Sequence, residues 1–148
     1  MHKQEELTTF ATVYRKKIEA GASAVTGWEA AKQALVDRLY VVANHLIKLG
    51  IPVEINHEQN VRSVGFSLPA RELSSTVIAP RHDLLFTLAP ERLVKICDGT
   101  GYLFASVEPY ELVQKDCLAI ENAIARFFAN VVANPGLQFT EEIQEAVS

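Results

Sequence analysis

The chain has 148 residues, of which 49% are hydrophobic and 22% are charged, and its formal net charge is −4. This length and balance are typical of one folded domain, and they exclude a disordered chain, which needs fewer hydrophobic residues and more net charge. Because nucleic-acid affinity depends on neutralising phosphates, the acidic balance also argues against a nucleic-acid partner. We therefore predict a single domain over residues 1–148.

The beginning of the chain, residues 1–6, is polar and lacks the apolar stretch of a signal peptide. The longest nearly uncharged run, residues 21–28, is too short and too polar to cross a bilayer. Two isolated cysteines, Cys97 and Cys117, do not make a disulfide framework, and we expect both to be reduced. The sequence therefore predicts a cytoplasmic protein without a membrane anchor.

Residues 1–50 are predicted to form a pair of helices. Gly21 is suited to end the first helix because it takes a positive φ without steric cost. Thr26 and Glu29 have the spacing of a capping box, which predicts a new helix start. Gly50 and the proline after Ile51 predict the end of the second helix. The apolar residues of the first segment recur at helical spacing: Leu7, Phe10, Ala11, Tyr14 and Ile18.

The second predicted helix is apolar over more than half of its circumference. A sheet can cover only one side of such a helix, and monomers rarely expose large apolar patches. We therefore expect self-association, with a two-fold homodimer as the commonest arrangement, or else a different protein partner. The residues predicted to form this interaction surface are Trp28, Leu35, Leu39, Tyr40 and Ile47.

Residues 51–106 change to the alternating apolar pattern that is typical of strands. Short turns join the segments, and no helical pattern separates them, which favours an antiparallel meander of about five or six strands. A turn at residues 98–101 is predicted to close the last hairpin. The predicted strands lie near residues 53–55, 64–68, 75–79, 83–88, 93–97 and 102–106.

Residues 108–133 are predicted to form one long amphipathic helix that packs on one face of the sheet. Pro109 suits its first turn, and Pro135 prevents its continuation. The tail, residues 137–148, is expected to contain a short helix from residue 141 to residue 147. The predicted fold class is therefore α+β: two N-terminal helices, an antiparallel sheet and a long C-terminal helix.

Five residues are candidates for chemistry, although none belongs to a strong motif. His57, Glu58, His82 and Asp83 lie in predicted turns and would surround a metal if both turns met at one edge of the sheet. Cys97 at a strand end could act as a nucleophile with His82 as its base. The alternative for all five is a structural role, as polar turn residues and a buried thiol. We predict no catalytic set, no metal and no cofactor.

Two function classes remain open. The first is a non-enzymatic protein-interaction domain, such as an adaptor, a small acidic chaperone or an immunity-type binder, which fits the size, the charge and the lack of a catalytic motif. The second is a small-molecule binding or catalytic domain with a pocket between the sheet and the long helix. Inward-pointing polar residues on the strands would favour the second class, and the plausible ones are Ser67, Thr87 and Tyr102.

Overall fold

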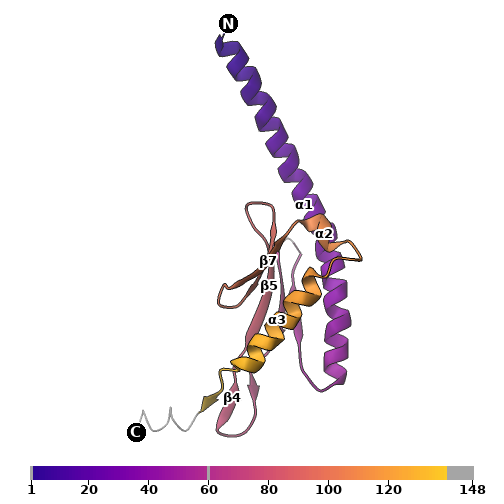
Figure 1. The fold of residues 1–148 in the computed structure, drawn as a ribbon, viewed down its shortest axis with the longest axis vertical. Helices are drawn as coiled ribbons and strands as arrows, with labels where there is room; N and C mark the ends of the chain where they lie inside the picture. Colours follow the sequence, from indigo (N-terminus) through magenta and orange to yellow (C-terminus); the bar gives the residue numbers. More distant parts are fainter. Residues whose placement is uncertain (1, 60, 140–148) are drawn as a thin grey trace, which may run out of the picture.

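The computed structural model of the chain describes residues 2–59 and 61–139, with side chains for all of these except residues 2 and 20–26. It is an α+β structure, as predicted, in which helices cover one face of a five-stranded antiparallel sheet (Figure 1). Among the residues described, no helix is both long enough and apolar enough to cross a bilayer.

The two helical segments predicted for residues 1–50 are joined into one unbroken helix, α1 (His2–Lys48). The segment around Gly21 is rich in alanine, the best helix former, and contains no proline, so one glycine is not enough to end the helix. The predicted C-terminus is confirmed. Gly50 has a φ of 85°, and the Ile51 amide donates to the Leu46 carbonyl at 3.0 Å, which is the hydrogen bond of a Schellman cap.

The main sheet has the strand order β1-β2-β5-β6-β7, and every neighbouring pair is antiparallel. The turn predicted at residues 98–101 is confirmed between its last two strands, and Gly101 has a φ of 90° there. The strands are β1 (Glu54–His57), β2 (Ser63–Leu68), β5 (His82–Leu88), β6 (Val94–Asp98) and β7 (Leu103–Val107).

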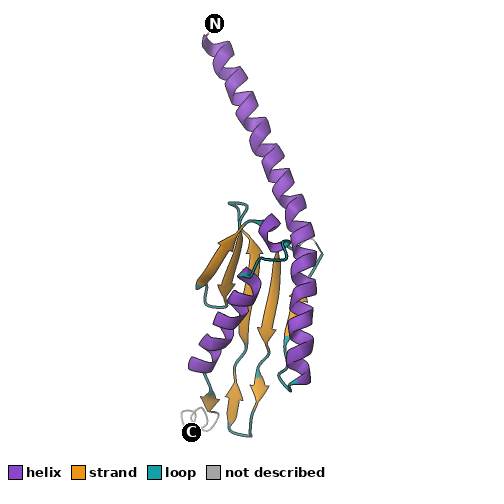
Figure 2. Cartoon of the chain, turned by 45° about the vertical axis from the view of Figure 1, so that its right-hand side comes forward, coloured by secondary structure: helices purple, strands orange, loops and turns teal. Residues whose placement is uncertain are grey.

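A second, smaller sheet continues the hairpin of β2 and β5 away from the main sheet (Figure 2). It consists of β3 (Arg71–Glu72), β4 (Val77–Ala79) and β8 (Gln138–Phe139). The strand predicted at residues 75–79 therefore lies outside the main sheet. Pro69 and Pro80 stand between the two sheets, and neither can donate a main-chain hydrogen bond to a sheet. The helix predicted for residues 141–147 lies outside the described residues.

The prediction of one long helix over residues 108–133 is wrong. The structure contains a short helix, α2 (Pro109–Leu112), and a 15-residue helix, α3 (Ala119–Ala133). Arg38 of α1 donates hydrogen bonds to main-chain carbonyls on both sides of the break. Leu112 of α2 and Ile120 of α3 are both fully buried in the core.

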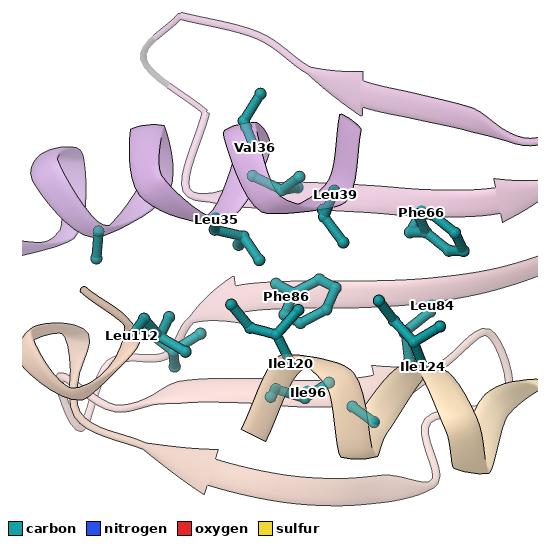
Figure 3. Close-up of a cluster of buried hydrophobic side chains, with 14 of the residues drawn as sticks. Leu35, Val36, Leu39, Phe66, Leu84, Phe86, Ile96, Leu112, Ile120 and Ile124 are labelled. Carbon is teal, nitrogen blue, oxygen red and sulfur yellow. The ribbon is translucent and has the colours of Figure 1, made fainter. Parts of the chain in front are cut away.

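The hydrophobic core lies between the sheet and the three helices (Figure 3). Side chains alternate along the strands, so residues two apart share a face. The face toward the helices is apolar, whereas the opposite face, called here the open face, carries residues such as Ser67, Asp83 and Leu85. The strands supply Val64, Phe66, Leu84, Phe86, Val94 and Ile96 to the core, and the helices supply Trp28, Leu35, Leu39, Leu112, Ile120, Ile124 and Phe127.

Candidate functional site

The N-terminal part of α1 projects away from the sheet and the other helices (Figures 1 and 2). We call residues 2–19 the arm. Its large apolar side chains are exposed: Leu7 by 67%, Phe10 by 66% and Tyr14 by 56%. Val13 and Ile18 are about half exposed as well. Scattered apolar residues on a surface are ordinary, but a row of them at helical spacing is typical of a surface that binds another protein.

The apolar stripe of the arm continues the buried face of the same helix. Phe10 precedes Trp28 by about five turns of 3.6 residues, so both side chains lie on one side of α1. Trp28 is buried at the end of the core. The arm therefore presents to solvent the face that the rest of α1 buries against the sheet.

The folded body, from which the arm projects, begins where α2 packs on α1. A Cβ atom added to Gly27 would lie 4.0 Å from Cβ of Pro109, which is ordinary van der Waals contact, and Pro109 is buried. This contact marks the edge of the folded body, because Trp28 follows in the core and residues 3–10 are exposed.

The hydroxyl groups of Thr8 and Thr12 in the arm are hydrogen-bonded to the helix itself. The Thr8 hydroxyl donates to the Gln4 carbonyl at 2.9 Å, and the Thr12 hydroxyl donates to the Thr8 carbonyl at 3.0 Å. The rings of Phe10 and Tyr14 stack with their centroids 5.9 Å apart. The threonines thus do not interrupt the apolar stripe with unpaired hydroxyl groups.

The interaction surface predicted from the sequence is largely buried inside the chain. Trp28, Leu35 and Leu39 lie in the core, so they cannot take part in an exposed surface. The reason is that β1, β2 and α2 of the same chain pack on the side of α1 that was expected to need a second chain. Tyr40 and Ile47, the other two residues of that set, are exposed.

A groove of about 740 Å³ opens at the end of the main sheet, beside the C-terminal half of α3. Its walls come from the start of β5, the turn between β6 and β7, and one side of α3. Its polar lining includes His82, Asp98, Arg126, Asn130 and Asn134. The sequence analysis did not single out Arg126 or Asn130, because the groove exists only where α3 meets the hairpin of β6 and β7.

Two of the charged side chains that line this groove, Asp98 and Arg126, are already engaged. Burial raises the pKa of Asp98, but hydrogen bonds from Thr100 and Tyr102 outweigh it and leave the pKa of Asp98 below its usual value. Arg126 donates to the Phe104 carbonyl at 3.4 Å, and its guanidinium lies 5.9 Å from the centre of the Phe104 ring. Asp98 therefore acts as a turn-stabilising group. Arg126 and Arg81 are the two cations that line the groove, and Arg81 is paired with Asp83 and Glu54.

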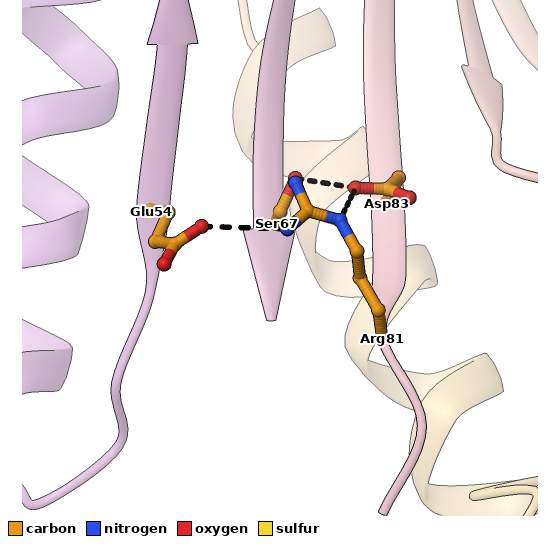
Figure 4. Close-up of polar contacts among 4 residues, drawn as sticks. All are labelled: Glu54, Ser67, Arg81 and Asp83. Atoms are coloured by element: carbon orange, nitrogen blue, oxygen red, sulfur yellow. Dashed lines mark hydrogen bonds and ion pairs between the residues drawn. The ribbon is translucent and has the colours of Figure 1, made fainter. Parts of the chain in front are cut away.

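A polar cluster lies on the open face of the sheet (Figure 4). Arg81 contacts Asp83 at 2.9 Å and Glu54 at 3.4 Å, and so connects β5 to β1 across β2. The buried Ser67 hydroxyl donates to Asp83 at 2.5 Å. Every carboxylate in this cluster has a partner, so its geometry is that of a structural network.

The structure does not bring the two predicted metal-binding pairs together. His57 is aligned with Val64, whereas His82 is aligned with Leu68, so the two histidines lie at opposite ends of β2. His57 packs edge-on against Tyr40, and Nε2 of His82 lies 3.0 Å from the Pro135 carbonyl oxygen. Within the described part of the chain, no three His, Cys, Asp or Glu residues are grouped as metal ligands would be.

Glu58 stays beside His57 in the turn after β1, whereas Cys97 is separated from its proposed base. The Glu58 carbonyl accepts a hydrogen bond from Lys32 at 2.5 Å, in the turn after β1. Cys97 is aligned with Leu85 and therefore points to the open face, whereas His82 points with Leu84 toward the helices. A Cys97–His82 dyad is thus incompatible with the alternation of the strands.

The polar residues expected inside a sheet–helix pocket are also divided between two faces. Ser67 and Thr87 lie on the open face, on the side of Asp83 and Leu85. Tyr102 is exposed and lines the groove beside α3. The groove is therefore the place where the structure brings polar side chains of the sheet and α3 together.

Comparison with models of known protein families, with curated proteins and with solved structures finds no match to this chain.

Proposed function

We propose that this protein is a non-enzymatic protein-interaction domain, which binds its partner through the arm of α1. The observation that carries the proposal is the exposed apolar stripe of Leu7, Phe10, Val13, Tyr14 and Ile18 on a helix that projects from the body. An amphipathic helix can bind a partner through side chains at positions i, i+3, i+4 and i+7. The arm has this spacing at Leu7, Phe10 and Tyr14.

The location we propose is the cytoplasm, as expected from the sequence. Both cysteines within the described residues are free thiols, which is the usual state in a reducing compartment. An adaptor, a small acidic chaperone and an immunity-type binder are all compatible with a binding helix on a compact body.

Site-specific photo-crosslinking in living cells tests the proposal. A photoreactive phenylalanine analogue at Phe10 is expected to give a discrete crosslinked product with one protein, which mass spectrometry identifies. The same analogue at Val41 is the matched control, because Val41 is 72% exposed on the far side of the same helix from the core. If position 10 gives no product beyond those of position 41, the arm is not the binding surface and the proposal fails.

A second candidate is a small-molecule site in the groove beside α3. It is favoured by Arg126, a cation at the groove wall, together with the nearby side chains of His82 and Asn130. These groups suit a small carboxylate or phosphate, since a guanidinium binds such anions through charge-assisted hydrogen bonds.

Thermal melting with a panel of small carboxylates and phosphates tests this candidate. A ligand of the groove should raise the melting temperature of the wild-type protein and have a smaller effect on Arg126→Ala. Arg71→Ala, on the exposed strand β3, is the control. An equal rise in all three proteins would show that the groove does not bind the ligand.

A further inference from the structure

We propose that the partner of the arm is a second copy of this chain, and that the two arms pair antiparallel. This inference rests on the proposed function and deepens it by naming the partner and its orientation. The observations that carry it are the exposure of the apolar stripe, the distribution of charge along the arm and the position of the body at one end of the helix.

The apolar residues of the arm are arranged so that two copies can cover each other. An antiparallel pair centred between Phe10 and Ala11 places Leu7 of each copy opposite Tyr14 of the other. Phe10 then packs near the centre of the pair, against the small side chain of Ala11. At the centre a large side chain therefore faces a small one, which lets the two helices approach closely, and Leu7 packs against the Tyr14 ring on either side.

The charges of the arm change sign along its length. Near the N-terminal end Glu5 and Glu6 outnumber Lys3, and near the other end Arg15, Lys16 and Lys17 outnumber Glu19. An antiparallel pair brings the acidic end of each arm beside the basic end of the other. A parallel pair would place acidic beside acidic and basic beside basic, which is unfavourable.

One opposite-charge pair is specific to the antiparallel arrangement. At about 100° per residue, Glu6 and Lys17 point in nearly the same direction, on the flank of the helix that Phe10 and Val13 share. In an antiparallel pair with a two-fold axis perpendicular to both helices, a given flank of one helix lies beside the same flank of the other. The two helices run in opposite directions. Glu6 of each copy is therefore within reach of Lys17 of the other, and the pair forms twice in the dimer.

The folded bodies do not obstruct this pairing. The body begins near Trp28, which lies about 25 Å along the helix from the centre of the proposed pair, at about 1.5 Å per residue. The two bodies would stand at opposite ends of the paired arms, about 50 Å apart. The long helix thus holds the two sheets away from the interface.

Sedimentation equilibrium of the full chain across a wide concentration range tests the proposal. The wild-type chain is expected to reach twice the chain mass. Phe10→Asp should raise the dimer dissociation constant by at least about tenfold, because it places a charge on the stripe. Val41→Asp is the matched control and should leave association unchanged. A wild-type chain that stays a monomer up to about 1 mM would overturn the proposal.

Charge reversal tests the orientation independently of the apolar contacts. Glu6→Lys alone and Lys17→Glu alone should each weaken the dimer by about tenfold, since each reversal makes two repulsive pairs. The double variant, and an equal mixture of the two single variants, should restore association. Single reversals without effect, or a double variant that stays weak, would rule out the antiparallel pairing.

Different experimental results would overturn the proposed dimer and the proposed function. A wild-type monomer whose Phe10 position crosslinks to another protein would overturn the dimer and leave the proposed function standing. A dimer that Phe10→Asp does not weaken, together with no crosslink at position 10, would overturn both.

Discussion

Arg38 donates a hydrogen bond from Nη2 to the main-chain carbonyl of Cys117, at 3.2 Å. Its Nη1 donates to the Leu112 carbonyl, also at 3.2 Å, and its Nε lies 3.8 Å from Glu121. These two carbonyls stand at the end of α2 and just before α3. A single side chain of α1 therefore holds both sides of the break in the predicted C-terminal helix.

Arg38→Ala should lower the free energy of unfolding by about 1–3 kcal/mol, because it removes two charge-assisted hydrogen bonds to partly buried carbonyl groups. Urea melts measure the change. Lys115→Ala, at an exposed position of the same connection, is the control and should change stability by less than about 0.5 kcal/mol. Equal effects from the two substitutions would contradict the role assigned to Arg38.

Phe127→Ala should destabilise the protein by about 3–5 kcal/mol, since its ring is only 3% exposed and packs edge-on against Phe66. Val132→Ala in the same helix is the matched control. Val132 is 82% exposed, so this substitution should lower the free energy of unfolding by less than about 0.5 kcal/mol. A large effect at Val132 in urea melts would mean that a different face of α3 packs on the sheet.

Ser67→Ala should lower the free energy of unfolding by about 1–2 kcal/mol, because it removes a buried hydroxyl that donates to Asp83. The loss should be much smaller when Asp83 is already alanine, and a double-mutant cycle measures this coupling. If the effects of the two substitutions simply add, Ser67 and Asp83 contribute independently and the network in Figure 4 is not cooperative.

Asp98→Asn should lower stability by about 1 kcal/mol at neutral pH, because the carboxylate accepts hydrogen bonds from the Thr100 and Tyr102 amides. The pKa of Asp98 is lowered in the folded state. Its stabilising effect is therefore complete above the unfolded pKa of about 3.9 and is lost as the pH falls through the lower folded pKa.

Urea melts in steps from about pH 7 to about pH 2 measure this dependence. The stability difference between the wild-type protein and Asp98→Asn should shrink as the pH falls. A difference that is the same at every pH would show that the ionised carboxylate is not the source of the stabilisation.

Much of the fold could be predicted because it follows from local patterns. Alternation of apolar residues predicted the strands of the main sheet, and Gly50 before Ile51 and Pro52 predicted the end of α1. The turn at residues 98–101 was predictable from its aspartate and glycines. In each case, the deciding interactions lie within a few residues of one another along the chain.

The candidate sites could be predicted less well, because they depend on which faces of the strands and helices pack against each other. The Cys97–His82 dyad is plausible from sequence, but strand register puts the two side chains on opposite faces of the sheet. The groove beside α3 is lined by both Arg126 and His82, which are far apart in the chain and are brought together only by the fold. No local pattern in the sequence indicates that β1, β2 and α2 pack on the side of α1 that carries Trp28 and Leu35.

The sequence by itself determined the α+β class, the antiparallel strands and the apolar stripe of the arm, since periodicity and turn chemistry are local properties. Only the tertiary structure decided that α1 runs unbroken past Gly21 and that α2 separates from α3. Residues 113–118 contain neither glycine nor proline, so the break has no local signal. It forms because Arg38 of α1 binds the freed main-chain carbonyls on both sides of it.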